Sequence, residues 1–92
     1  MNSFSALSDP TRRRILELLS AGEMSAGDIA QRFDMTAAAI SQHLKALKNA
    51  NLVRVRAQAQ RRIYQLAPEG FDEPARWLER TRMMGAPANN HA

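Results

Sequence analysis

Apolar residues in the first part of the chain recur at the spacing of an α-helix. A helix predicted near residues 10–21 has a stripe to bury that consists of Ile15, Leu16, Leu18 and Leu19. Asp9-Pro10 suits its start, because Asp accepts bonds from free backbone N–H groups and Pro fits the first helical position. Gly22 suits its end. A short helical turn is expected before it, around residues 4–7.

Two further helices follow, joined by a short connection. Residues 25–28 (SAGD) fit a capping box, which begins a helix that runs to about residue 33. Thr36 is suited to cap the next helix, residues 37–49. Asn51 is expected to close that helix in the left-handed conformation, which Asn tolerates better than most residues. The pair predicts a helix-turn-helix.

The spacing of apolar residues then changes to every second position. Residues 52–56 and 61–66 predict the two strands of a β-hairpin, with valines facing inward and Arg54 and Arg56 facing outward. The tip, residues 57–60, contains no Gly, Asn, Asp or Pro, so the turn type is not predicted.

A last helix is predicted over residues 72–84, and residues 85–92 (GAPANNHA) are predicted to be a disordered tail. The length indicates one domain, residues 1–84. The predicted fold class is mainly α with a small β-hairpin. It is a winged helix-turn-helix, in which the helices are followed by a two-stranded wing and a C-terminal helix.

Positive charge is concentrated in the middle of the chain. Between Asp34 and Glu69 there are six basic residues and no acidic one, whereas the rest of the chain carries seven basic and nine acidic residues, a net charge of 7 − 9 = −2. Charge separated in this way indicates a polyanionic partner, although a solvated basic face is the simpler alternative for a charge run alone.

Composition excludes several classes of protein. There is no cysteine, so disulfides, thiolate metal sites and cysteine nucleophiles are absent. The sequence has no Gly-rich phosphate loop and no nucleophile beside a base, so an enzyme is not expected. We expect no association with the membrane and a cytoplasmic location, because no apolar run spans a bilayer and the first residues do not resemble a secretory signal.

The helix predicted over residues 37–49 carries an unusual outward side. Opposite its apolar stripe lie small, hydrogen-bonding and basic side chains without any acid, and such side chains can approach base edges and phosphates. The residues assigned to base contacts are Thr36, Ala38, Ser41 and Gln42. Gln42 is the first choice, because its amide can bond an adenine edge in bidentate fashion.

Contacts to phosphate and the wing are assigned mainly to basic residues. These candidates are His43, Lys45, Lys48, Arg54, Arg56, Gln58, Gln60, Arg61 and Arg62. For His43, a structural role is the alternative to a phosphate contact, and the sequence favours both over a metal ligand. Double-stranded DNA is the favoured partner. A winged helix that binds proteins or RNA is the alternative, but the basic face is kept and Tyr64 is the only aromatic residue in the strands.

Three stretches of the sequence carry a family resemblance. LSDPTRRRILELL, MSAGDIAQRFDMTAAAISQHLKALKNANLV and RRIYQLAPEG resemble the ArsR family of bacterial repressors, and WLER near Arg80 resembles its SdpR-type branch. The likeness extends from about Phe4 to Arg80, with Asn51 where the family commonly has glycine. It implies a homodimeric repressor with one helix in the major groove; repression itself is inferred from the resemblance alone.

The resemblance also implies which residues form the dimer and which sensors are missing. In the family the first and last helices form the interface, which assigns Phe4, Leu7, Trp77 and Leu78 to dimerisation. Ser25 and Gly27 occupy the positions at which the thiolate-sensing members of the family have two cysteines. The predicted last helix lacks the histidine ligands of the metal-sensing members. We therefore expect no metal and no cofactor. Control by protein concentration and control by an unknown small molecule both remain open.

Overall fold

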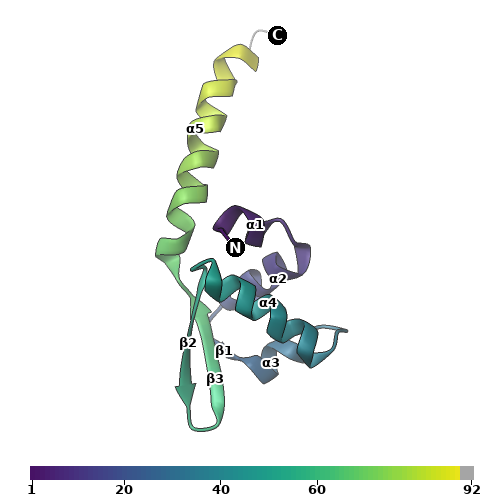
Figure 1. Ribbon diagram of the computed structural model, residues 1–92. Coiled ribbons are helices and arrows are strands. Elements are labelled where there is room, and N and C mark those ends of the chain that lie inside the picture. Colours follow the sequence, from purple (N-terminus) through teal and green to yellow (C-terminus); the bar gives the residue numbers. More distant parts are fainter. Residues whose placement is uncertain (90–92) are drawn as a thin grey trace.

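The computed structural model describes residues 1–89, which fold into a group of helices with a small sheet at one side (Figure 1). Each predicted element is present, but the helix predicted to run to about residue 33 ends at Ala30. One short strand and a 3₁₀ helix were not predicted. In chain order the elements are α1 (Ser3–Leu7), α2 (Pro10–Ser20), β1 (Met24–Ser25), α3 (Ala26–Ala30), α4 (Ala37–Asn49), β2 (Val53–Gln58), β3 (Arg61–Leu66), the 3₁₀ helix η1 (Pro68–Phe71) and α5 (Asp72–Asn89).

The helices begin at the polar caps expected from the sequence. The side chains of Asp9, Ser25 and Thr36 accept backbone N–H bonds of 2.9, 3.1 and 3.0 Å at the starts of α2, α3 and α4. These bonds satisfy N–H groups that have no partner within the helix. The capping box differs in its second half, because the Asp28 carboxylate pairs with Arg61 at 3.2 Å in place of a bond back to Ser25.

The sheet has three antiparallel strands in the order β1-β3-β2. Val53 pairs with Leu66 and Gln58 with Arg61, so the hairpin is longer than predicted and its turn consists of Ala59 and Gln60. Ala59 adopts a positive φ of 56°, which no turn residue in the sequence indicated. The unpredicted strand β1 adds two residues to the free edge of β3.

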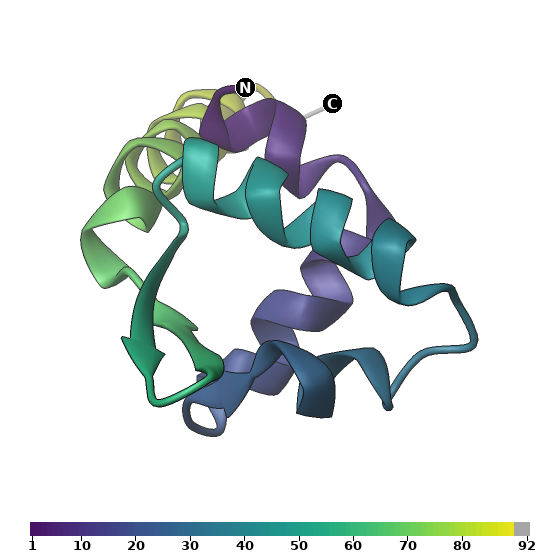
Figure 2. The same cartoon turned by 60° about the horizontal axis from the view of Figure 1, so that its bottom comes forward.

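The core lies where α2, α3, α4 and the sheet enclose a common space (Figure 2). Its largest fully buried side chains are Ile15, Ile29, Ile40, Leu44, Leu47 and Leu52. The stripe predicted for α4 faces inward, as helical spacing requires. In the stripe predicted for α2, Ile15, Leu16 and Leu19 are buried, but Leu18 is only partly buried.

The end of α4 is held by the segment that follows the hairpin. Asn51 has a φ of 61°, which confirms its predicted left-handed conformation. Next to it, the Ala67 N–H donates to the Leu52 carbonyl at 3.0 Å, and the Gly70 N–H donates to Ala67 at 2.9 Å. This segment fixes the place from which α5 leaves the body.

Helix α5 projects away from the rest of the chain (Figure 1), and the molecule measures 56 × 26 × 24 Å. The helix continues to Asn89, beyond the predicted end at Met84, so residues 85–89 of the predicted tail are helical. The remaining tail residues, 90–92, lie outside the described residues, and the division into domain and tail stays a prediction. Within residues 1–89, no helix combines the length and apolar character needed to cross a bilayer.

Candidate nucleic-acid interface

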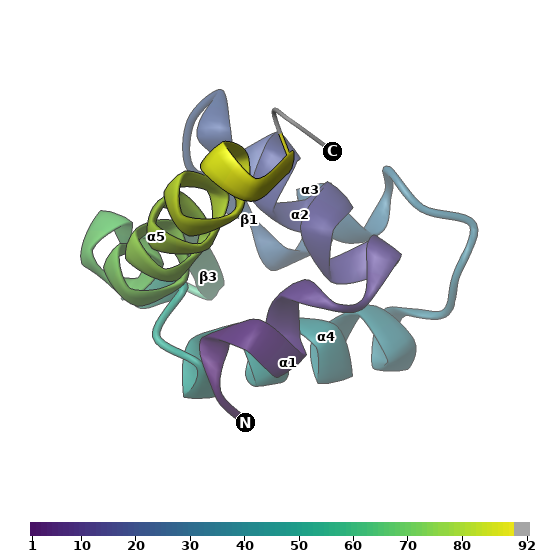
Figure 3. The same cartoon turned by 90° about the horizontal axis from the view of Figure 1, so that it is seen from above.

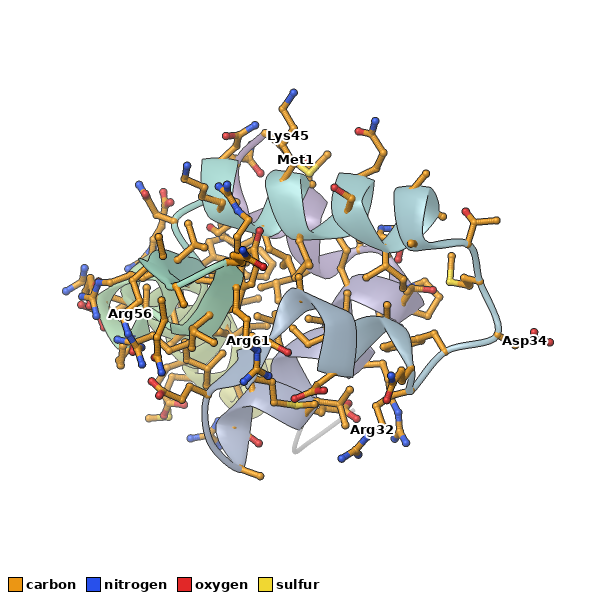
Figure 4. All side chains as sticks on the ribbon, turned by 90° about the horizontal axis from the view of Figure 1, so that it is seen from below. Met1, Arg32, Asp34, Lys45, Arg56 and Arg61 are labelled. Carbon is orange, nitrogen blue, oxygen red and sulfur yellow. The ribbon has the colours of Figure 1, made fainter. Side chains whose placement is uncertain are left out.

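The outward side of α4 is exposed along its length and contains no acidic residue. Its exposed side chains are Ala38, Ser41, Gln42, Lys45, Lys48 and Asn49, while Ile40, Leu44 and Leu47 are buried on the opposite side. Figure 4 shows Lys45 pointing away from the core. Since acids would be repelled by phosphates and long side chains would keep the backbone at a distance, this surface is suited to approach a DNA groove.

A groove of about 530 Å³ lies beside α4, between α3 and the start of β3. Its floor includes the buried side chains of Ile40, Leu44 and Tyr64, and its rim carries Lys45, Lys48 and Arg62, with no acid among the lining residues. Within the described part of the chain, these three cations form no ion pair. Their charge is therefore unbalanced and available to an anion.

The other three arginines of the hairpin are already paired. Arg54 bonds Glu69, Arg56 bonds Glu23 through two contacts of 2.7 and 2.8 Å, and Arg61 bonds Asp28 at 3.2 Å (the positions of Arg56 and Arg61 are marked in Figure 4). The acids come from outside the basic segment, so the sequence did not reveal these pairs. Their role as DNA contacts stays a prediction, because half-exposed pairs of this kind are weak and can exchange partners.

The Glu23–Arg56 pair links the turn before β1 to strand β2. Its hydrogen bonds lower the pKa of Glu23 and raise the pKa of Arg56. Since a depressed carboxyl pKa favours the charged form in the folded state, this pairing is present at neutral pH and is lost as the pH falls through the lowered pKa of Glu23.

His43 lies apart from the outward group. Its side chain is 19% exposed and faces the start of α2, with Nδ1 3.8 Å from an Asp9 oxygen and 3.4 Å from an Arg12 nitrogen. The side chain is thus turned inward to two partners that the sequence did not reveal, which favours the structural role for His43. A phosphate contact by His43 stays a prediction.

The remaining predicted contacts lie at the two ends of this surface. Thr36 is exposed at the start of α4, where its hydroxyl caps the helix. Gln58 and Gln60 are exposed at the hairpin tip on either side of Ala59. Gln58 also accepts a bond of 3.1 Å from Arg56, so this side chain is held along the hairpin.

An apolar surface lies on α1 and α5. Phe4 and Trp77 meet edge to face with their ring centres 5.8 Å apart, and both rings are nearly half exposed. Leu78 is 60% exposed, and Met83 and Met84, which were not assigned to the interface, extend the surface along α5. Apolar patches of this kind mark interaction sites. Leu7 differs, because it packs partly against the core.

No cluster of three or more His, Asp or Glu side chains able to hold a metal ion is found among the residues that the structure describes. The expectation that no metal regulates the protein stays a prediction. The structure thus has a capped pair of helices, an outward side of α4 without acidic residues and a β-hairpin beside that helix. Together these features define a winged helix-turn-helix protein.

Comparison with known proteins identifies the family. Residues 9–55 match the family described as bacterial regulatory protein, arsR family, and the chain belongs to it. This confirms the resemblance expected from the sequence. The family consists of transcription regulators, so the prediction that the chain is not an enzyme is also confirmed.

Individual relatives agree with this assignment. Over 77 residues the chain is 42% identical to the transcriptional repressor SdpR of Bacillus subtilis, covering 84% of this chain and 86% of SdpR. It is 46% identical to the HTH-type transcriptional regulator Rv2034 of Mycobacterium tuberculosis over 75% of this chain, but spans only 64% of that protein. The homodimeric winged helix-turn-helix DNA-binding domain of Mb0332 from Mycobacterium bovis has a TM-score of 0.67 and 32% identity, covering 88% of this chain and 72% of that one.

Proposed function

We propose that the protein binds double-stranded DNA in the cytoplasm as a homodimer and represses transcription from an inverted-repeat operator. The observation that supports this most strongly is the outward side of α4, which has no acidic residue and lies beside a groove with three cations that form no ion pair within residues 1–89. The relatives support the assignment, since SdpR is described as a transcriptional repressor and Mb0332 as a homodimeric DNA-binding domain.

The roles within the proposed interface follow from the positions of the side chains. Gln42, with Thr36, Ala38 and Ser41, faces base edges in the major groove. Lys45, Lys48 and Arg62 hold the phosphates of the strand that passes along the groove between α4 and β3. Gln58 and Gln60 at the hairpin tip reach the neighbouring minor groove.

The apolar surface on α1 and α5 forms the proposed dimer interface. Its centre consists of Phe4, Trp77 and Leu78, which are exposed in the single chain. A two-fold axis through this surface would set two α4 helices about 34 to 36 Å apart, one turn of the double helix.

Selection of bound duplexes from a random library, followed by a salt titration on the selected sequence, tests this function. We expect an inverted repeat with half-sites one helical turn apart and a steep dependence of affinity on salt. Failure to enrich any duplex contradicts the proposal. Preferential binding of single-stranded RNA in a competition assay would favour the RNA-binding alternative.

Replacing Gln42 by Ala should relax base preference at one position of each half-site. The lost bidentate contact is worth about 1 to 3 kcal/mol of discrimination. Repeating the selection with Gln42→Ala checks this, with Asn49→Ala at the far end of the exposed row as the control. An unchanged selected sequence would remove Gln42 from base readout.

Replacing Arg62 by Gln should weaken binding to all duplexes and reduce the slope of log affinity against log salt by about one. Arg54→Gln is the matched control, because it removes the same charge from a residue that Glu69 already pairs. We expect its slope to change by less than about half as much. Equal changes of the salt slope in Arg62→Gln and Arg54→Gln would show that the groove beside α4 is not the site that binds phosphate.

A further inference from the structure

The side chain of Arg12 connects three helices. From α2 its Nε donates to the Ala6 carbonyl at 2.9 Å and one terminal nitrogen donates to the Ser5 carbonyl at 3.1 Å. These carbonyls lie at the end of α1, where the Ser5 carbonyl also accepts from the Ser8 backbone N–H at 3.2 Å and from the Ser8 hydroxyl at 2.7 Å. The other terminal nitrogen lies 3.4 Å from His43 Nδ1 on α4. One guanidinium therefore bridges α1 and the helix proposed to read DNA, and Figure 3 shows these two helices side by side.

Asp9 competes with Arg12 for the same ring nitrogen. Its carboxylate caps α2 through the Arg12 N–H at 2.9 Å and lies 3.8 Å from His43 Nδ1. The backbone bond from Arg12 is the main reason that the pKa of Asp9 is lowered, so this carboxyl is charged at neutral pH. Among the described residues, Asp9 and Arg12 are the charged groups within bonding distance of the ring.

The protonation of His43 decides which of these partners its Nδ1 can bind. Arginine is only a donor, so a bond with Arg12 requires an unprotonated Nδ1. A protonated Nδ1 repels the guanidinium and is attracted to the Asp9 carboxylate. The two arrangements differ in the charge of the ring, so a change of pH can test the exchange of partners.

We propose that Arg12 and His43 are positioning residues that couple α1, in the dimer interface, to the setting of α4 against DNA. This inference rests on the proposed function. An inverted repeat is read only if the two α4 helices keep a fixed separation, and that separation is set by the dimer helices. Arg12 bonds both α1 and the His43 ring. When Arg12 releases the ring, the direct polar connection between the dimer interface and α4 is lost.

The pH dependence of operator binding tests the coupling. Lowering the pH from 7.5 to 5.5 should raise the dissociation constant for the selected duplex in both proteins. We expect the factor of this rise to be about five times larger for the wild type than for His43→Gln, because one hydrogen bond is worth about five-fold in affinity. Glutamine keeps an acceptor for Arg12 at both pH values and has no proton to gain. Fluorescence anisotropy with labelled duplex gives both ratios, and other titrating groups cancel between the two proteins. Equal ratios would overturn the coupling while leaving DNA binding intact.

A comparison of Arg12 with its neighbour Arg13 distinguishes the proposed coupling from simple capping of α1. Arg13 donates to the Leu7 carbonyl of α1 at 2.8 Å, so it caps the same helix, but within residues 1–89 its side chain makes no hydrogen bond to α4. We expect Arg12→Lys to lose the additional pH effect and Arg13→Lys to keep it. The same behaviour in both variants would reduce Arg12 to a cap and overturn the proposal.

If no duplex is bound by any protein, the proposed function fails. The coupling is then judged by sedimentation at the two pH values, where equal dimer constants for wild type and His43→Gln overturn it.

Discussion

Replacing Trp77 by Ala should raise the dimer dissociation constant by at least about 30-fold, corresponding to about 2 kcal/mol. Trp77 lies at the centre of the exposed apolar surface and meets Phe4 edge to face at 5.8 Å, so truncation removes an aromatic anchor together with its neighbour's contact. Affinity for the inverted repeat should fall in parallel, because a monomer engages one half-site. Analytical ultracentrifugation and anisotropy measure the two losses.

The control for this prediction lies two residues further along α5. Glu79 is exposed and pairs with Arg82 within the same helix, so Glu79→Ala should leave the dimer constant nearly unchanged. The wild-type protein supplies a second check, since Trp77 is its single tryptophan. On dilution through the dimer constant, its emission should shift to longer wavelength as the ring becomes hydrated. A dimer that persists in Trp77→Ala with unchanged affinity would place the interface elsewhere.

Much of the fold was accessible from sequence because local physics determines it. The stripes of α2 and α4, the caps at Asp9 and Thr36 and the left-handed Asn51 each depend on residues within a few positions of one another. Strand β1 escaped prediction because two residues show no periodicity, and its existence depends on β3, about forty positions away. The turn at Ala59 carries no residue that favours its positive φ.

The candidate site was predictable in its residues but less so in its charges. Outward positions on α4 follow from helical spacing, so Gln42 and Lys45 were identified correctly as exposed. The partners of Arg56 and Arg61 come from 33 positions earlier in the chain, a separation over which sequence spacing carries no geometric information. The same reason applies to His43, whose contact with Arg12 joins residues 31 positions apart. Consequently the sequence did not reveal the partners of these arginines, and the structure leaves Arg62 as the unpaired arginine among the described hairpin residues.

Replacing Gly70 by Ala should lower the free energy of unfolding by about 3 kcal/mol or more, with a fall in Tm of roughly 10–20 °C. A Cβ at Gly70 would lie 1.8 Å from the Asn51 carbonyl oxygen and 2.7 Å from its carbon. Both are backbone atoms at the closed end of α4, so the clash cannot be relieved by a side-chain rotation. Relief requires the segment between β3 and α5 to move, which shifts the dimer helix as well.

Gly27→Ala is the matched control, and it should have the opposite sign. An added Cβ at Gly27 meets nothing within 4 Å, and the residue lies inside α3, where Ala is favoured over Gly by about 0.5 to 1 kcal/mol. Thermal unfolding followed by circular dichroism compares the two variants with the wild type. Because the substitution is chemically identical, a difference in sign isolates the close approach of Gly70 to Asn51. If Gly70→Ala melted within a few degrees of the wild type, the segment between β3 and α5 would be able to shift at little energetic cost, which contradicts the prediction. The dimer helix would then not be held rigidly to the end of α4.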